Sequence, residues 1–288
     1  PIGATEQHGP HLPLYTDTIT AIEVSTRVAE HIGYLHTPPI WMGYSPQHMH
    51  APGSGRGTIT VRASTLLAIM NDVARSLIHH GFNRIHFING HGSNTKVVDP
   101  VLRKLRYETG ALISFINPWM ENYEGILKGL MENPPEETPG WHASELETSQ
   151  DMAYNRDLVR MERAEKTLAH VPEWLPRSFA KKDGMPDVEF DGYKYFRFPM
   201  DHHEFIESGT IGNPMRATVE KGEEALERFA AETRRARLRS RVPEAVQRAV
   251  SDLADEVGLE LPSPEDETEV VLEDEEDAHG GVMAAMPQ

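Results

Sequence analysis

The order of helical and strand patterns between residues 64 and 119 is the feature that most constrains the fold. Apolar residues at helical spacing predict an amphipathic helix over Ser64–His80, and the apolar run RIHFIN that follows Gly81 predicts a buried strand. A second helix is predicted through Lys96–Thr109, and a second strand in ALISFINPW, residues 111–119. Helices that alternate with short apolar strands are typical of domains with a parallel sheet. We therefore expect an α/β fold.

A glycine-rich segment, NGHGSN at residues 89–94, follows the first of these strands. Functional side chains in parallel sheets gather at the carboxyl ends of the strands, and Gly90 and Gly92 free the backbone around His91. A tight turn with an incidental histidine is the alternative interpretation. Neither GxGxxG nor GxxxxGK[ST] occurs, which argues against a nucleotide-binding loop.

The opening segment, PIGATEQHGPHLPLYTD, carries several possible metal ligands between glycines and prolines. In an extended loop, Glu6 and His8 point the same way because they are two residues apart. Asp17 stands at the start of a helix predicted over Thr18–Ile32, where it could instead be an N-cap. Each acid alone could be solvated or capping, but the grouping predicts metal binding. We expect His11 to be a loop residue behind the ligands.

A third polar group lies in WHASELETS, residues 141–149. His142 and Glu145 are three residues apart and share a face if the segment is helical, whereas Glu147 is expected to point elsewhere. Ser144 and Glu147 could instead act as helix-start groups, and spacing alone does not choose between these interpretations.

Two further histidine segments are weaker candidates. His48, in SPQHMH, is a candidate for the rim of a cleft. In DHHEFIESGTIGNP, residues 201–214, two adjacent histidines face different ways, so we expect at most one of them to line a site.

Composition narrows the function. The net charge of −17, from 45 acidic and 28 basic residues, argues against a phosphate-binding surface for nucleic acid. The absence of cysteine excludes thiolate metal sites, and no apolar run reaches the roughly 18 residues of a membrane span. We expect a cytoplasmic protein without nucleic-acid or membrane partners.

Taken together, the motifs EQHGPHLP-x₃-D, NGHGxN and HAxExETS resemble those of the creatininase family of metal-dependent amidohydrolases. PGxGRGTIT and GTIGNPMRATVEKG add to the resemblance, which runs from residue 1 to about 230. It implies a three-layer α-β-α sandwich with a mostly parallel central sheet in a single domain over 1–242, interrupted by an irregular insertion at about 165–200. Residues 243–288 would form an extension with an acidic, disordered tail. The resemblance also implies a homohexamer built as a trimer of dimers.

The resemblance further implies a site with two divalent metal ions, which could be zinc, manganese or iron. Glu6 and His8 would each bind one ion, Asp17 would bridge both, and His91 would join Glu6. Because Ser93 stands where creatininase itself has a glutamate ligand, the last ligand is assigned to Glu145. His142 matches the catalytic histidine of the family. The expected substrate-binding residues are His48, Ser93 and Trp141.

The expected activity is therefore metal-dependent hydrolysis, in which a metal-bridging hydroxide cleaves a C–N (amide) bond of a small polar substrate, cyclic or open-chain. Hydrolysis of a C–C bond in a cyclic keto-polyol such as 3-dehydro-scyllo-inosose is the alternative, and a non-catalytic binding protein on the same fold is the second. The missing glutamate counts against creatinine as substrate. Aromatic and basic residues of the insertion could line a pocket or form an oligomer contact: Trp174, Arg177, Lys181, Lys182, Tyr193 and Tyr195.

Overall fold

The structure is a computed structural model that describes residues 1–49, 52–118, 123–132, 142–180 and 187–235, together with Arg248 and Asp252. The chain divides into two compact units, Pro1–Pro243 and Glu244–Gln288, and the fold described below is that of the first. Several predictions fall outside the described residues: those on Trp141, Lys181, Lys182, the side chain of Tyr195 and the acidic tail.

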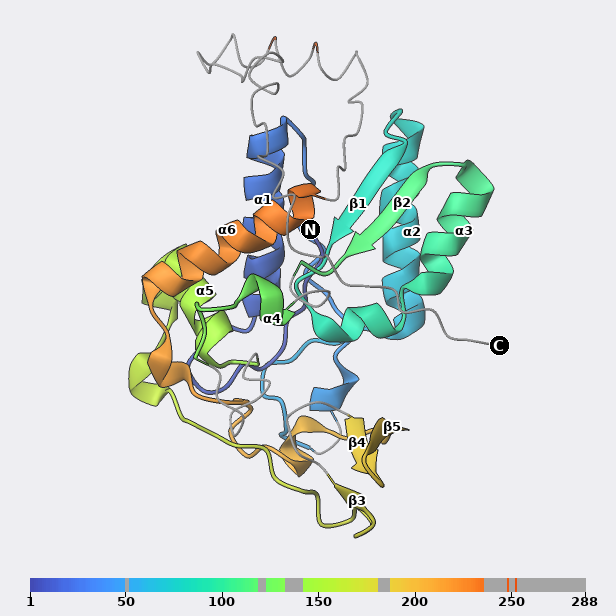
Figure 1. Cartoon of the computed structure of the whole chain (residues 1–288). Coiled ribbons are helices and arrows are strands. Elements are labelled where there is room, and N and C mark those ends of the chain that lie inside the picture. Colours follow the sequence, from blue (N-terminus) through green and yellow to red (C-terminus); the bar gives the residue numbers. More distant parts are fainter. Residues whose placement is uncertain are drawn as a thin grey trace, which may run out of the picture. The chain divides into compact units, whose positions relative to one another are not determined.

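Two parallel strands form the centre of this unit (Figure 1). β1 (Arg84–Ile88) pairs with β2 (Leu112–Ile116) in register, from Arg84 opposite Leu112 to Ile88 opposite Ile116. Single bridges from Ile2 to Ile40 and to Asn89 continue the pairing on the other side of β1. The predicted α/β class with a parallel sheet is confirmed, while the three-layer sandwich stays a prediction.

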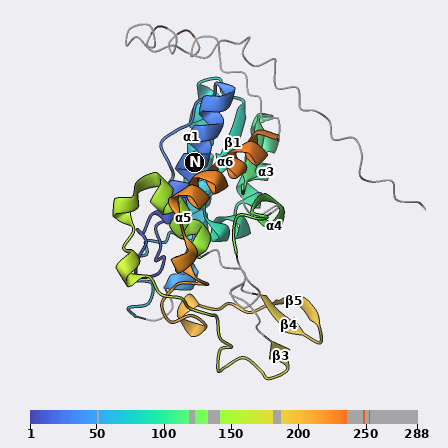
Figure 2. The ribbon, with the colours of Figure 1, turned by 60° about the vertical axis from the view of Figure 1, so that its left-hand side comes forward.

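Helices pack against both faces of β1 because its apolar side chains alternate. Ile85 and Phe87 lie in one core with α2 (Ala63–His79) and α3 (Asp99–Thr109). Ile88 lies in another core, to which α1 (Thr16–Ile32), α4 (Tyr123–Ile126), α5 (Glu145–Asn155) and α6 (Val219–Arg235) contribute. Figures 1 and 2 both show α6 crossing close to α1 and α5.

The helix boundaries differ from the predicted ones at two informative places. α1 begins at Thr16, so Asp17 lies inside its first turn and is not an N-cap. α3 begins at Asp99 and not at Lys96, because Gly92–Lys96 forms the separate 3-10 helix η2. Gly33 ends α1 in the left-handed conformation, with φ of 65°.

The predicted insertion contains a small antiparallel sheet, so the expectation of an irregular segment is wrong in part. Its strands β3 (Phe179–Ala180), β4 (Asp187–Phe190) and β5 (Tyr193–Arg197) pair in that order. A two-residue turn with positive φ at Asp191 (49°) and Gly192 (81°) joins β4 to β5. The sheet has a separate apolar core, formed by Leu175, Val188, Met200, Phe205, Ile206 and Ile211.

Single turns of 3-10 helix complete the description. They are η1 (Pro46–His48), η4 (Arg156–Leu158), η5 (Met161–Arg163), η6 (His202–Glu204) and η7 (Pro214–Arg216). Among the described residues, no helix combines the length and the apolar character that a membrane crossing requires.

Candidate metal centre

Five ligand-type side chains from four segments meet beyond the carboxyl end of β1. Glu6 and His8 come from the opening loop, Asp17 from the first turn of α1, His91 from the residues after β1, and Glu147 from the first turn of α5. The first four are buried and Glu147 is half-buried. We call these five residues the carboxylate–imidazole cluster. The structure thus brings together the predicted ligands Glu6, His8, Asp17 and His91.

The cluster contains two groups that share one carboxylate. In the first, His91 Nδ1 lies 2.9 Å from Asp17 Oδ2 and 3.5 Å from Glu6 Oε1. In the second, His8 Nε2 lies 3.3 Å from Asp17 Oδ1 and 3.4 Å from Glu147 Oε2. Asp17 therefore presents one oxygen to each group. These separations match the roughly 3.3 Å between ligand atoms around a tetrahedral ion with bonds of about 2.0–2.1 Å.

Backbone carbonyls orient the imidazoles of the site. His8 Nδ1 lies 3.1 Å from the carbonyl oxygen of Glu6, and His91 Nε2 lies 3.1 Å from that of Tyr44. A carbonyl only accepts, so the geometry assigns the ring hydrogen to these nitrogens. The other nitrogen of each ring, which faces the carboxylates, is left with its lone pair for a metal ion. This is the arrangement that fixes metal-binding histidines in proteins.

The electrostatics of the cluster also favour a cation. Burial alone would lower the pKa of His91, but Glu6 and Asp17 raise it to about 9. Burial opposes the charged form of His8 too, yet Glu147 and Asp17 raise its pKa well above the usual range. Burial would raise the pKa of Glu6, whereas His91 and His48 hold it well below its usual range. The metal-free cluster therefore holds protons that a divalent cation can replace.

One orphaned atom supports the same conclusion. His8 Nε2 is buried and, within the described part of the chain, finds no partner with hydrogen-bond geometry. Buried polar atoms normally have a partner, and a metal ion would supply one here. The residues present therefore fit a metal centre by donor type, spacing and unsatisfied valence.

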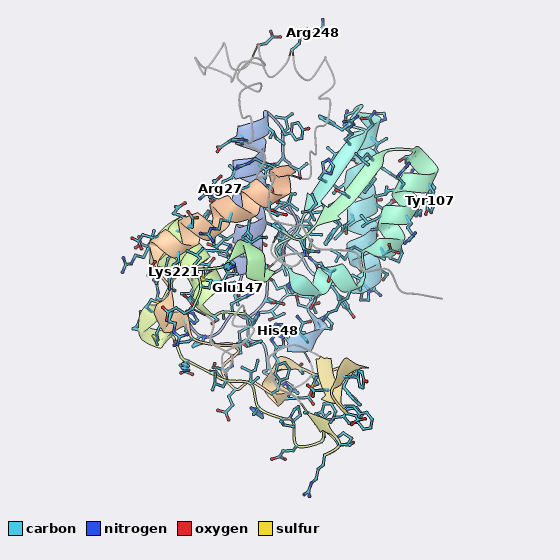
Figure 3. All side chains as sticks on the ribbon, in the orientation of Figure 1. Arg27, His48, Tyr107, Glu147, Lys221 and Arg248 are labelled. Carbon is cyan, nitrogen blue, oxygen red and sulfur yellow. The ribbon has the colours of Figure 1, made fainter. Side chains whose placement is uncertain are left out.

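The structure does not place Glu145 in the cluster, which corrects the predicted fifth ligand. The Glu145 carboxylate binds Lys221 Nζ at 2.5 Å and accepts a hydrogen bond from the backbone N–H of Glu132. The predicted helical spacing fails because α5 begins only at Glu145 and Ala143 adopts a positive φ of 51°. Glu147 turns back instead and accepts a hydrogen bond from the backbone N–H of Ala143 at 2.6 Å. Figure 3 labels Glu147 and Lys221 near the crossing of α5 and α6.

Three further histidines, His48, His142 and His202, adjoin the cluster, and we call them the histidine triad. The His142 ring centroid lies 4.3 Å from that of His8, and His48 Nε2 lies 3.3 Å from Glu6 Oε2. His202 stacks edge-on against His48, with centroids 4.3 Å apart. Burial lowers the pKa of His142 to about 3 and that of His202 well below the usual range, so both rings are neutral.

Sequence reasoning did not select His202, although it expected at most one of the two adjacent histidines to line a site. Only His202 belongs to the triad, and His203 Nδ1 pairs with Asp201 Oδ1 at 2.6 Å. Both histidines nevertheless line a cavity beside the triad, so the expectation is wrong for the cavity. Ser93, the other predicted substrate-binding residue in the described chain, is buried in η2, two residues beyond His91. His11 lies behind the ligands, as expected, with Nε2 3.0 Å from Thr148 Oγ1.

A cavity of about 390 Å³ opens beside the triad. His48 and His202 form part of its wall, and the other titratable residues in its lining are Arg56, Glu165, Asp201, His203 and Glu207. Figure 3 shows His48 on the side of the ribbon that faces the β3–β5 sheet. The lining does not include Trp174, Arg177 or Tyr193, which are exposed. Of the described residues in the predicted insertion, only Glu165 lines the cavity, and the neighbouring wall comes from residues 201–209, beyond β5.

Comparison with known proteins agrees with the family resemblance of the sequence motifs. The sequence profile of the creatininase family, described as creatinine amidohydrolase, matches residues 1–236. Creatinine amidohydrolase of Pseudomonas putida is 32% identical over 238 residues, which cover 79% of this chain and 83% of that protein. The 3-dehydro-scyllo-inosose hydrolase of Thermotoga maritima is 29% identical over 79% of this chain and 72% of that protein.

Solved structures are also similar. A mutant creatininase of the Zn–Zn type superposes with a TM-score of 0.62 at 30% identity, over 82% of this chain and 87% of that one. A manganese creatininase superposes with a TM-score of 0.61 at 29% identity, over the same shares. A shorter match, over 38% of this chain and 45% of the relative, is 39% identical to a mycofactocin precursor peptide peptidase of Mycobacterium ulcerans.

Proposed function

Since this chain belongs to the creatininase family and is a hydrolase, we propose that it uses two divalent cations to cleave a C–N bond of a small polar substrate. The observation that carries the proposal is the position of Asp17, whose two oxygens face two separate groups of ligands. Glu6, Asp17 and His91 would hold one cation, and His8, Asp17 and Glu147 the other.

The donor set defines which cations suit the site. Three carboxylates and two imidazoles are hard-to-borderline ligands, which accept Zn²⁺, Mn²⁺ or Fe²⁺. Their three negative charges offset most of the four positive charges of two divalent ions. When bound, such a pair of ions lowers the pKa of a water molecule and polarises a carbonyl group.

His142 is the residue best placed to move a proton. Its Nε2 lies 3.1 Å from the carbonyl oxygen of Gln7, which assigns the ring hydrogen to that nitrogen. Its Nδ1 therefore carries the lone pair, 3.9 Å from Glu6 Oε1 at the edge of the cluster. The neutral ring can take a proton on Nδ1 and deliver it to a leaving nitrogen. Burial of the ring keeps bulk water from competing for that proton.

The cavity supports a small polar substrate. At about 390 Å³ it lies within the range of small-molecule sites, and its lining of histidines, carboxylates and one arginine suits a polar molecule. Amide cleavage is favoured because the relatives include a creatinine amidohydrolase and a peptide peptidase. The similarity to an inosose hydrolase keeps ring opening of a cyclic keto-polyol as the alternative, and Ser93 counts against creatinine itself.

A matched pair of substitutions tests the ligand set. Wild-type protein should hold two equivalents of metal by elemental analysis, and Glu147→Gln should hold at most one and lose at least about 100-fold in activity, because a direct ligand should matter at least as much as an outer-shell group. Glu145→Gln, two residues away, should keep both equivalents. Metal loss in Glu145→Gln with full occupancy in Glu147→Gln would reverse the assignment.

A hydrolysis screen then tests the substrate class. Creatinine, formamides, small peptides and inososes are offered to the fully loaded enzyme, and release of amine or ammonia is compared with ring opening. Turnover of amides supports the proposal. Turnover of inososes alone would replace it with C–C hydrolysis.

A further inference from the structure

The histidine triad has the composition of a metal site in its own right. His48 comes from η1, His142 from the segment before α5, and His202 from η6. One ring nitrogen of each lies within 4.8 Å of the others. Their ring centroids form a triangle with sides of 4.3, 4.8 and 5.5 Å. Three imidazoles with an open fourth position are a ligand set that Zn²⁺ accepts in proteins.

The tautomer of His142 and the environment of His202 bear on metal binding. His142 Nδ1 carries a lone pair because Nε2 faces the carbonyl oxygen of Gln7. His202 Nδ1 is buried and, among the described contacts, has no hydrogen-bond partner. Imidazole nitrogens that converge without a proton between them are costly to bury, and a cation removes that cost.

The surroundings also attract a cation. Glu165, Asp201 and Glu207 line the cavity beside the triad, against the single guanidinium of Arg56. A concave wall with an excess of negative charge raises the local concentration of cations.

We propose that His48, His142 and His202 bind a third divalent cation, and that this cation inhibits the enzyme. A cation on His142 Nδ1 would occupy the lone pair that otherwise takes the proton, and two of its ligands, His48 and His202, line the substrate cavity. The inhibition rests on the proposed function, whereas the binding does not. The ligand nitrogens must approach to about 3.3 Å for tetrahedral zinc. η1 and η6, which contact each other, are single turns that can make this adjustment.

Zinc binding to the holoenzyme tests the site. Enzyme dialysed to two equivalents of metal is titrated with Zn²⁺ by calorimetry, and hydrolysis is measured across the same zinc concentrations. A third equivalent should bind to wild type, with half-maximal inhibition at its dissociation constant. His202→Phe keeps a ring beside His48 and Phe205 but has no ligand atom, and it should weaken the third equivalent at least about 100-fold.

His203→Ala is the matched control, because the adjacent imidazole pairs with Asp201 and is not one of the three rings whose nitrogens converge in the triad. It should bind the third equivalent as wild type does. The proposal is overturned if wild type binds only two equivalents, or if His202→Phe binds the third as tightly. A third equivalent that binds without inhibition would retain the site but remove the role of His142 in proton transfer. Loss of the first two equivalents would instead contradict the proposed dinuclear centre.

Discussion

Replacing Gly90 with alanine is expected to disable the metal centre through a backbone contact. An alanine Cβ at this position would lie 2.0 Å from the carbonyl oxygen of Asp17 and 3.0 Å from the backbone nitrogen of Ala21. Ordinary van der Waals contact begins at 3.4 Å. The end of β1 and the first turn of α1 must therefore separate by about 1.4 Å to accommodate one methyl group.

That separation acts directly on the ligands, because Gly90 precedes His91 and the opposing carbonyl belongs to Asp17. Their side chains meet at 2.9 Å and would be drawn apart. A misplacement of about 1 Å can cost roughly 100-fold in rate, equivalent to about 2.7 kcal/mol. Overpacking adds a loss of about 1–3 kcal/mol in the free energy of unfolding.

The assay combines metal content, kcat/KM and thermal unfolding of Gly90→Ala. Metal content and kcat/KM should both fall, the latter at least about 100-fold. Gly33→Ala is the control, since no atom lies within 4 Å of its added Cβ and only the positive φ of 65° is strained. It should lower Tm by a few degrees and keep both metals. A Gly90→Ala enzyme with normal metal content and normal kcat/KM would refute the reasoning.

Three other changes test the surroundings of the cluster. Lys221→Met should lower the free energy of unfolding by about 3 kcal/mol, because it leaves the buried Glu145 carboxylate without its ion-pair partner. Denaturant unfolding measures this loss, and the metal content should not change. Asp151 is fully buried, and burial raises the pKa of its carboxyl group to about 8. Between about pH 4 and pH 8 the folded state therefore keeps a proton on Asp151 that the unfolded state has released. Stability should therefore decline as pH rises towards 8, and Asp151→Asn should flatten that decline in melts across this range; a wild-type slope in the variant contradicts it. Removal of metal by a chelator should lower Tm. Adding metal back should release protons near neutral pH, because the pKa of His91 is about 9 in the metal-free cluster. Calorimetry in buffers of different ionisation enthalpy detects this release.

The parts of the site that sequence could predict are those with local signals. Glu6 and His8 share a direction in an extended loop, and the glycines around His91 mark a strand end, so both segments were predicted correctly in position. The assignment of Glu145 failed because the positive φ of Ala143 breaks the helical spacing on which it depended. The residue types in HASE do not predict a positive φ at Ala143, since alanine rarely adopts the left-handed conformation.

The β4–β5 hairpin and the position of His202 differ in how well the sequence predicts them. The hairpin of β4 and β5 has a local signal, the dipeptide Asp191–Gly192 between two segments in which apolar and charged residues alternate, which is typical of a two-residue turn. His202 has no such signal. Its neighbours Phe205 and Ile206 pack in the apolar core of the β3–β5 sheet with Leu175 and Val188, and that contact joins residues far apart in the chain. The hexameric assembly also stays a prediction, because it rests on the resemblance alone.

The arrangement of the ligands links metal binding to the packing of the whole unit. Asp17 is fixed by α1, Glu147 by α5 and His91 by β1, and these elements meet in one apolar core with α6. Gly222 of α6 lies so close to α5 that an alanine Cβ there would stand 1.9 Å from the carbonyl oxygen of Ser149. Glu147 lies only two residues from Ser149 in α5, so its position depends on how closely α6 approaches. Gly90 and Gly222 therefore have the same physical role: each lacks a side chain, so that the backbone of a helix that carries a predicted ligand can approach closely.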